Sequence, residues 1–253
     1  MEGYTSATYG DAIADIYDTP GQCPPDAGEA AAFLHGLARR LAAERPRLLE
    51  FGVGTGRIAL PLAELGCAVT GVYSSAAMLE RCASADGEDR LRLLHEGMAT
   101  VDAGTASFEV VFAAYNTLFL ALTQQEQVEV FANARRHLVP GGAFVVQALV
   151  PDPASFTAHQ RVRVYDLQRQ LADLDVTLHD PLEQTLVSQY LILRPDRTEF
   201  RPSKLRYAWP SELDLMARLA GLQLEHRYAD WGHSRLTAGS TGHVSVYRVP
   251  EEG

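Results

Sequence analysis

The sequence predicts an α/β protein: a doubly wound, mostly parallel sheet with an inserted antiparallel β layer. Two observations predict this class. Over residues 27–150, segments with helical spacing of apolar residues alternate with short apolar segments of strand type, which is typical of a parallel sheet with helices on both faces. Over residues 151–208, longer segments alternate apolar with polar residues, as antiparallel strands do when one face meets water.

In the first part, each strand candidate is followed by a segment of helical period. Ser74 or Ser75 is placed to cap one of these helices. Thr123, with Glu126 three residues later, has the pattern of a capping box at the start of another. The expected strands are residues 47–53, 67–73, 90–96, 108–115 and 143–150, and the expected helices are residues 29–44, 55–66, 74–83 and 123–142.

In the second part, the strand candidates are longer, contain β-branched residues and are separated by turn signals such as Arg194–Arg197. The chain then returns to the first pattern, because Pro210 opens a helix that has Gly221 near its end, and a closing strand follows. The expected strands are residues 175–180, 183–195, 198–210 and 243–249.

Composition narrows the classes of function. The 32 acidic and 22 basic residues leave a net charge of -10, which repels nucleic acid and anionic lipid. Cys23, Cys67 and Cys82 are odd in number and lack the spacing of a metal site, so we expect no disulfide framework, no bound metal and a reducing cytoplasm. The sequence begins without the features of a signal peptide, and its most apolar stretch is too short for a membrane span.

The sharpest local signal is EFGVGTGR, in which Gly52, Gly54 and Gly56 lie between a strand and a helix. Such glycines let the chain turn sharply and let a ligand approach the backbone, while the helix start offers free N–H groups. A dinucleotide-binding loop requires a third glycine inside the helix, where this chain has Ala59 or Leu60. A cofactor that carries a carboxylate fits the loop better than a dinucleotide.

The chain resembles the class I S-adenosylmethionine (SAM)-dependent methyltransferases, in particular a group of small-molecule methyltransferases common in actinobacteria. The motifs follow one another in the order of that family and extend over about residues 9–248. The segments that carry the resemblance are LLEFGVGTGRIALPLAELG (48–66), VTGVYSSAAMLERC (69–82), AAYNTLF (113–119), HLVPGGAFVVQALV (137–150), LRYAWPSELDLMARLAGLQLEHRYADW (205–231) and HVSVY (243–247).

The resemblance implies a seven-stranded Rossmann-like sheet whose last strand runs antiparallel, and SAM or S-adenosylhomocysteine as the cofactor. It also implies four parts of the chain: an N-terminal lid (1–26), the SAM-binding core (27–150), a β layer over the acceptor site (151–208), and a C-terminal helix with the closing strand (209–253). The residues expected to contact the cofactor are Tyr17, Glu50, Gly52, Gly54, Gly56, Tyr73, Ser74, Gly97, Met98 and Asn116.

The chain departs from the family at acidic positions of the cofactor site. Relatives end the second strand with a carboxylate that holds the ribose, where this chain has Tyr73, and they place an aspartate for the adenine where it has Gly97. Gln147 replaces an acidic residue after the fifth strand. Each lost charge-assisted hydrogen bond weakens binding by roughly 1.5–3 kcal/mol. Glu96 and the ring of Tyr73 are candidates to compensate for this loss.

Candidate catalytic groups are those expected at the mouth of the sheet. Tyr115 and Asn116 follow the fourth strand, where acceptors bind in this fold, and His233 and His243 flank the loop before the last strand. The remaining histidine candidates are His35, His95, His137, His159 and His179. A candidate anion clamp for a phosphate or carboxylate of the acceptor is formed by Arg194, Arg197, Arg201, Lys204 and Arg206.

Three functions fit these observations. The first is SAM-dependent methylation of a small molecule, in a natural-product pathway. The second is a cyclase or isomerase that uses the fold without methyl transfer, with the cofactor site weakened or lost, and the third is a silent partner of an active homologue. We expect a small-molecule substrate and no nucleic-acid or membrane partner, and a homodimer is compatible with the sequence.

Overall fold

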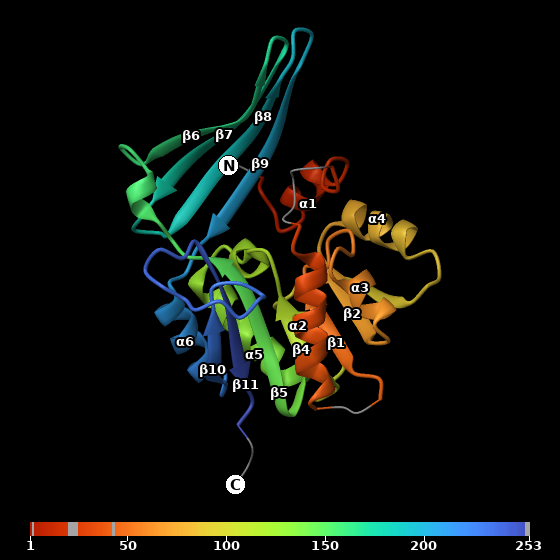
Figure 1. Cartoon of the computed structure of the whole chain (residues 1–253). Helices are drawn as coiled ribbons and strands as arrows, with labels where there is room; N and C mark the ends of the chain where they lie inside the picture. The colour runs from red at the N-terminus through yellow and green to blue at the C-terminus, as the bar shows by residue number, and fades with distance from the viewer. Residues whose placement is uncertain (2, 20–24, 42–43, 251–253) are drawn as a thin grey trace.

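The computed structural model describes residues 1, 3–19, 25–41 and 44–250, which form two sheets (Figure 1). The larger sheet has seven strands in the order β10-β11-β5-β4-β1-β2-β3. The smaller has four, in the order β6-β7-β8-β9. The strands of the larger sheet are β1 (Arg47–Phe51), β2 (Ala68–Tyr73), β3 (Leu91–His95), β4 (Phe108–Ala113), β5 (Leu138–Leu149), β10 (Gln223–Tyr228) and β11 (Gly242–Arg248).

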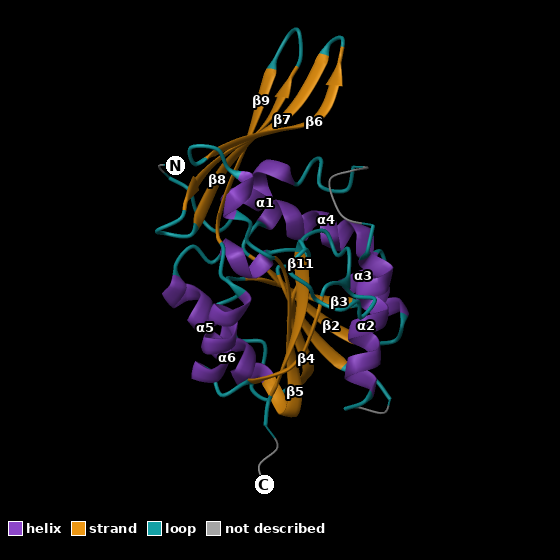
Figure 2. Cartoon of the chain, turned by 60° about the vertical axis from the view of Figure 1, so that its left-hand side comes forward, coloured by secondary structure: helices purple, strands orange, loops and turns teal. Residues whose placement is uncertain are grey.

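Helices cover both faces of the larger sheet (Figure 2). Its first five strands pair in parallel, and β11 pairs antiparallel with β5 and β10. This confirms the predicted fold class. The helices are α1 (Thr8–Ile13), α2 (Ala27–Arg39), α3 (Ala59–Glu64), α4 (Ala76–Asp86), α5 (Gln124–His137) and α6 (Pro210–Leu219), with short 3-10 turns η1 (Thr117–Leu120) and η2 (Pro153–Ser155).

The larger sheet has a hydrophobic core on each face, because successive side chains of its central strands point to opposite faces. In β1, Leu48 packs with α2, α3 and α4 on one face, whereas Leu49 and Phe51 pack with α5 and α6 on the other. Central strands of a parallel sheet are buried on both sides, and β4 is accordingly buried at every position. Two of the predicted caps are confirmed: the Ser75 hydroxyl accepts from the N–H of Met78, and Thr123 forms a capping box with its partner at the start of α5.

The sequence patterns did not predict two of the strands. The antiparallel layer has four strands rather than three, because residues 160–168 form β6 at its edge. Residues 223–228 form β10, which follows α6 directly. Both are edge strands with mostly exposed side chains, so their apolar signal is weak. The small sheet is made of β6 (Gln160–Gln168), β7 (Leu171–Asp180), β8 (Thr185–Leu193) and β9 (Thr198–Arg206).

The small sheet rises from the end of the larger sheet where α1 also lies (Figure 1). α1 packs against β9 and α4. The N-terminal residues therefore lie between the two sheets, at the end where open α/β sheets bind ligands. Among the described residues, none of the helices has the length and apolarity that a membrane crossing requires.

Candidate active site

The glycine loop joins β1 to α3 and depends on backbone conformations that favour glycine. Gly52, Gly54 and Gly56 have φ of 78°, 57° and 91°. A Cβ on Gly52 would collide with the side chain of Thr117, and one on Gly56 would lie 2.9 Å from the sulfur of Cys82. The loop is therefore packed closely against Thr117 and Cys82, and larger residues would not fit at these two positions.

Glu50, the last polar residue before this loop, is buried with 4% of its surface exposed. Its Oε2 atom has no hydrogen-bond partner among the described residues. Burial raises the pKa of this carboxyl well above its usual range, although the nearby Arg57 guanidinium opposes the shift. This oxygen can accept a hydrogen bond from a ligand, and the α-ammonium group of an amino-acid cofactor is one such donor.

A first cavity of about 410 Å³ lies beside the loop, at the carboxyl ends of β2 and β3. Tyr73 forms part of its wall and does not close it: the ring packs toward α1, where a Cβ on Gly10 would lie 2.7 Å from Cε1. Burial raises the pKa of the phenol, which stays neutral. The sequence-predicted residues on this wall are Gly52, Tyr73, Ser74, Glu96, Gly97 and Met98, and the structure adds Tyr4, Thr5, Ser6 and Thr117.

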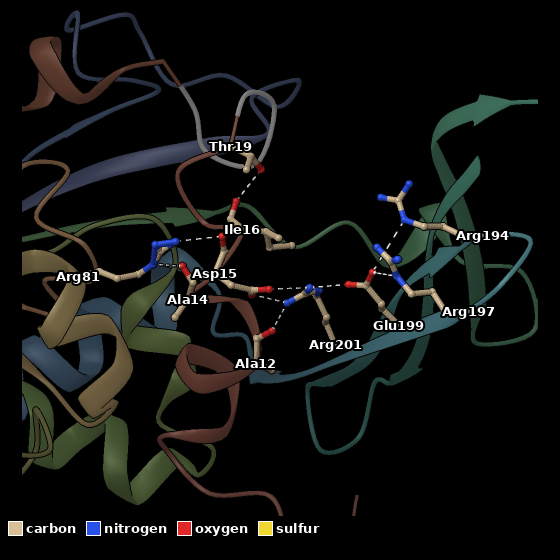
Figure 3. A network of polar contacts seen from close by, with 10 residues as sticks. All are labelled: Ala12, Ala14, Asp15, Ile16, Thr19, Arg81, Arg194, Arg197, Glu199 and Arg201. Carbon is tan, nitrogen blue, oxygen red and sulfur yellow. Dashed lines mark hydrogen bonds and ion pairs between the residues drawn. The ribbon is translucent and has the colours of Figure 1, made fainter. Parts of the chain in front are cut away.

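The N-terminal segment is held over the site by polar contacts with the core. The Ser74 hydroxyl donates to the carbonyl of Ser6 at 2.8 Å, and the Ser75 hydroxyl donates to Asp11 at 2.6 Å. Figure 3 shows a second set, in which Arg201 of β9 contacts Asp15. This segment supplies Tyr4–Ser6 to the first cavity, where no local sequence signal had marked them, and Tyr9, Ile13 and Tyr17 to a second cavity.

Tyr115 and Asn116 directly follow β4 and both have left-handed backbones, with φ of 50° and 64°. Such a pair is strained for residues other than glycine and persists when the surroundings hold it. The side-chain oxygen of Asn116 accepts from the N–H of Leu149 at 2.7 Å. The N–H of Tyr115 donates to the side-chain oxygen of Gln147 at 2.9 Å. Gln147 thus holds the ends of β4 and β5 together, and Asn116 lines neither cavity described here.

A second cavity of about 480 Å³ lies between the small sheet and α1. Tyr17 and Tyr115 are part of its wall, and the ring of Tyr17 lies 3.7 Å from the place that a Cβ on Gly54 would take. Tyr17 therefore lies between the cavity and the glycine loop. The polar residues of the small sheet that line it are Tyr165, Asp166, Asp173, Asp175, Ser188, Tyr190, Arg201 and Ser203.

Sequence reasoning missed the three aspartates of this cavity. The alternation in DLQRQLADLDV was a usable signal, because it places Asp173 and Asp175 on one face of a strand. The sequence did not predict that this face of the strand shares a cavity with Tyr17 and Tyr115.

The comparisons with known proteins agree with this geometry. A family model described as a methyltransferase domain matches residues 48–142. The structure of the CcbJ methyltransferase from Streptomyces caelestis is 43% identical, with a TM-score of 0.90 over 98% of this chain and 100% of that chain. The chain belongs to the class I SAM-dependent methyltransferase family. The cypemycin N-terminal methyltransferase from a Streptomyces species is 29% identical over 196 residues, which is 75% of this chain and 79% of that protein.

The fold recurs in more distant members of the family. SAM-bound CalS10, an amino pentose methyltransferase from Micromonospora echinaspora, has a TM-score of 0.68 at 21% identity and covers 88% of this chain and 91% of its own. SAM is the cofactor of this methyltransferase family, and the predicted SAM-dependent methylation is confirmed. The cyclase, isomerase and silent-partner alternatives receive no support from these comparisons.

The structure brings neither His233 nor His243 of the methyltransferase to the cavities described. His233 is exposed and stacks on Phe33, with ring centroids 4.9 Å apart. His243 is fully buried in β11, where Nδ1 shares a hydrogen bond of 2.9 Å with the hydroxyl of Ser245. Four other histidines also contact neighbours: His95 meets the carbonyl of Ser74, His137 lies between Asn133 and Ala103, His179 contacts Tyr207, and His159 lies near His179. His35 lies half-buried on α2.

The four arginines of the predicted anion clamp do not converge on one site. Arg194 and Arg197 pair with Glu199 at the tip of the sheet (Figure 3). Arg201 pairs with Asp15 and also with Glu199, and Arg206 contacts Glu212 inside the core at 2.8 Å. Each of these four arginines forms an ion pair with a neighbouring carboxylate, which neutralises its charge toward an anionic ligand.

Proposed function

We propose that this methyltransferase N-methylates a small natural-product molecule that carries an amine, and that the amine binds in the second cavity. The observation that supports this most is the set of three carboxylates in the cavity wall, Asp166, Asp173 and Asp175. A cavity with this charge attracts and orients a cationic group. It disfavours an acceptor that presents a carboxylate or phosphate to the same wall.

The balance of charge in the cavity supports an amine. Among the described residues that line it, the cation is Arg201, which pairs with Asp15 and Glu199, at 2.6 and 2.7 Å. The Oδ1 atom of Asp173 is buried without a hydrogen-bond partner among the described residues, and Oδ2 accepts from the Tyr190 hydroxyl at 3.3 Å. A carboxylate oxygen in this state lacks a donor, which an amine N–H would supply.

The charge that develops on the acceptor atom during methyl transfer also favours an amine. SAM supplies an electrophilic methyl group on sulfur. A bound ammonium first gives a proton to solvent or to a cavity carboxylate. When the neutral nitrogen donates its lone pair to that carbon, the carbon–sulfur bond breaks and the sulfur leaves with the electron pair. Positive charge then develops on the nitrogen, and carboxylates that face it stabilise the transition state more than the neutral amine. The nitrogen then loses its extra proton to solvent or to a cavity carboxylate. A hydroxyl acceptor would need a base before attack and would develop no such charge.

The positions of Tyr17 and Tyr115 support a site in which the amine meets the cofactor. Tyr17 and Tyr115 line the acceptor cavity, and Tyr17 also packs on Gly54. We propose that SAM lies along the glycine loop with its α-ammonium at Glu50 and its nucleoside in the first cavity. In that arrangement the two tyrosines flank the place where the acceptor meets SAM and exclude water around the reacting atoms. The further residues proposed to hold SAM are Gly52, Tyr73, Ser74, Gly97 and Met98.

The proposed acceptor class is consistent with the relatives, which are described as an N-terminal methyltransferase and an amino pentose methyltransferase. A cavity of about 480 Å³ also suits a ligand of small-molecule size. We propose a cytoplasmic enzyme, in keeping with the reduced cysteines expected from the sequence.

The test compares matched acceptors on the purified chain with SAM. Pairs of an amino sugar or cyclic amine and the corresponding alcohol are incubated, and methylated product is detected by mass spectrometry. We expect methylation of the amines and none of the alcohols. Methylation of the alcohols alone would overturn the proposal.

Two variants test the carboxylates. We expect Asp173→Asn and Asp175→Asn to raise KM for the amine by about 10-fold or more, since a hydrogen bond to a charged group contributes about 1.5–3 kcal/mol. Asp196→Asn is the control, because that carboxylate lies at the exposed tip of the sheet. An unchanged KM in both cavity variants would also count against the proposal.

A further inference from the structure

A third cavity, of about 550 Å³, lies where the small sheet meets the end of β5. Its wall comes from three parts of the chain: the segment between β5 and β6, strand β6 itself, and the loop before β11. Residues that line it include Ser155 and Phe156, Arg161 and Arg163, and Ser240 and Thr241. Two arginines therefore share one cavity in a chain whose net charge is -10.

The third cavity adjoins the second, acidic cavity. In the register between β6 and β7, Arg163 lies directly opposite Asp175, and Arg161 lies opposite Thr177. Residues in such a pair point to the same face of the sheet, with Cβ atoms about 5 Å apart. Since Arg163 lines the third cavity and Asp175 lines the second, the two cavities are neighbours on one face of the small sheet.

The guanidinium of Arg161 is oriented by two contacts and is not fully satisfied. Its Nη1 atom donates to the hydroxyl of Ser155 at 3.0 Å, and its central carbon lies 4.5 Å from the centroid of the Phe156 ring. Its Nε atom is buried without a hydrogen-bond partner among the described residues. Buried donors usually have an acceptor, and an oxygen atom of a ligand is one acceptor that would serve.

The charges of these two arginines are not neutralised by ion pairs. Arg201 and Arg206 on β9 each pair with carboxylates, whereas in the described part of the chain neither Arg161 nor Arg163 has a carboxylate within 4 Å. Burial, and then the nearby charge of Arg163, lower the pKa of Arg161, which nevertheless stays protonated at neutral pH. A bound anion would offset both effects.

We propose that the third cavity binds an anionic group of the acceptor, a carboxylate or a phosphate, while the amine of the same molecule lies at the aspartates of the second cavity. This rests on the proposed function and narrows its substrate class to amines that carry an oxyanion. A guanidinium group binds such an oxyanion through two parallel hydrogen bonds. The hydroxyls of Ser240 and Thr241, which line the same cavity, are further donors.

The two cavities together fix the orientation of the acceptor. The carboxylates of the second cavity repel an oxyanion, and the arginines of the third cavity repel an ammonium group. The amine is therefore directed to the cavity that Tyr17 and Tyr115 also line, next to the glycine loop. Strand and residue spacings place the two charged groups of the acceptor about 5–10 Å apart.

The experiment measures the affinity of probes that differ only in the anionic group. Ligand-observed NMR on the full chain with S-adenosylhomocysteine gives Kd for 4-aminobutanoate, 6-aminohexanoate and 8-aminooctanoate, and for the amino alcohol of each length. We expect at least one amino acid to bind about 10-fold more tightly than its amino alcohol. Tighter binding of 6-aminohexyl phosphate than of 6-aminohexanoate would assign the anion as a phosphate, and weaker binding would assign it as a carboxylate.

Variants locate the anion. Arg163→Gln should abolish the preference for the amino acid, and its side chain is exposed enough for the fold to tolerate the change. Arg169→Gln is the matched control, because Arg169 is exposed in the turn after β6 and lines neither cavity. Arg161→Lys keeps the charge without the planar fork and should weaken the preference only in part. Circular dichroism and Tm verify that each variant is folded.

Two results would overturn the proposal. One is that no amino acid or phosphate binds more tightly than its amino alcohol, which includes the absence of any binding. The other is a preference for the anion that persists unchanged in both Arg161→Gln and Arg163→Gln.

Hexanoate, which has no amine, separates this proposal from the proposed function. We expect Arg163→Gln to weaken hexanoate binding and Asp173→Asn to leave it unweakened, whereas 6-amino-1-hexanol should show the opposite dependence. If the amino alcohol does not depend on Asp173, the amine assignment fails while the hexanoate result still decides on the anion site. Hexanoate binding that is unaffected by Arg163→Gln would count against the anion site alone.

Discussion

The guanidinium of Arg201, on β9, donates to both carboxylate oxygens of Asp15, at 2.6 and 3.1 Å. It also donates to the carbonyl of Ala12 (Figure 3). This contact joins the small sheet to the N-terminal segment, which provides walls for both cavities. The Arg201 guanidinium lowers the pKa of the Asp15 carboxyl. The pairing is therefore complete above about pH 4 and is lost only as the pH falls further.

Replacing this arginine should loosen the N-terminal segment. We expect Arg201→Met to weaken SAM binding about fivefold, because the net contribution of a largely screened ion pair is about 1 kcal/mol. Calorimetry measures the affinity, and limited proteolysis of the N-terminal segment reports its release. Arg197→Met, at the tip of the sheet, is the control and should leave both unchanged. Equal behaviour of the two variants would contradict a role for the contact in holding the segment.

We expect Glu50 to lower the stability of the apo protein and to strengthen its binding of SAM. Its raised pKa means that the folded chain retains a proton which the unfolded chain releases. The apo protein therefore loses stability as the pH rises from about 4.5 through the folded pKa. We expect Glu50→Gln to raise the Tm of the apo protein at neutral pH. We also expect it to weaken SAM binding about 10-fold or more, since the ammonium group loses a charged partner.

The pH profile supplies a second readout for Glu50. SAM affinity of the wild type should fall as the pH drops through the pKa of this carboxyl, and the profile of Glu50→Gln should be flat over that range. Glu64→Gln is the control, because that side chain is 65% exposed on α3. A lower apo Tm together with unchanged SAM affinity would show that Glu50 serves the fold alone.

Tyr73 ends β2, where the resemblance to the family predicts a carboxylate that holds the ribose. We expect Tyr73→Asp to strengthen SAM binding by about 10-fold, because one charge-assisted hydrogen bond contributes about 1.5 kcal/mol. The same change should lower Tm, since the ring packs against Gly10 and α1. Tyr73→Asn loses the same packing without adding charge and should bind SAM no more tightly than the wild type. If both variants bind equally, the native site needs no carboxylate at this position.

His243 should affect stability and not methyl transfer. Burial lowers its pKa to about 4. The unfolded chain takes up a proton below about pH 6.5, whereas the folded chain does so only near pH 4, so stability should fall by roughly 3 kcal/mol across this interval. Denaturant unfolding at several pH values should show a flatter profile for His243→Gln. Its kcat at neutral pH should match the wild type, and a loss of 100-fold would restore His243 as a catalytic candidate.

Local patterns accounted for the architecture. The alternation of residues 27–150 predicted the parallel sheet, and the caps at Ser75 and Thr123 were read correctly because a cap depends on neighbours three residues away. The edge strands β6 and β10 were missed because exposed strands carry little apolar signal. The altered acidic positions at Tyr73 and Gly97 were also visible in the sequence, and both residues line the first cavity.

By itself, the sequence determined the fold class, the family and the glycine loop, because periodicity, capping and motif order are properties of neighbouring residues. Only the tertiary structure decided that Asp166, Asp173 and Asp175 share a cavity with Tyr17. It also placed His243 inside the sheet and turned the apolar face of β6–β9 outward. These depend on which face of each strand meets which distant segment, and a one-residue change of register would reverse the faces without altering the local pattern.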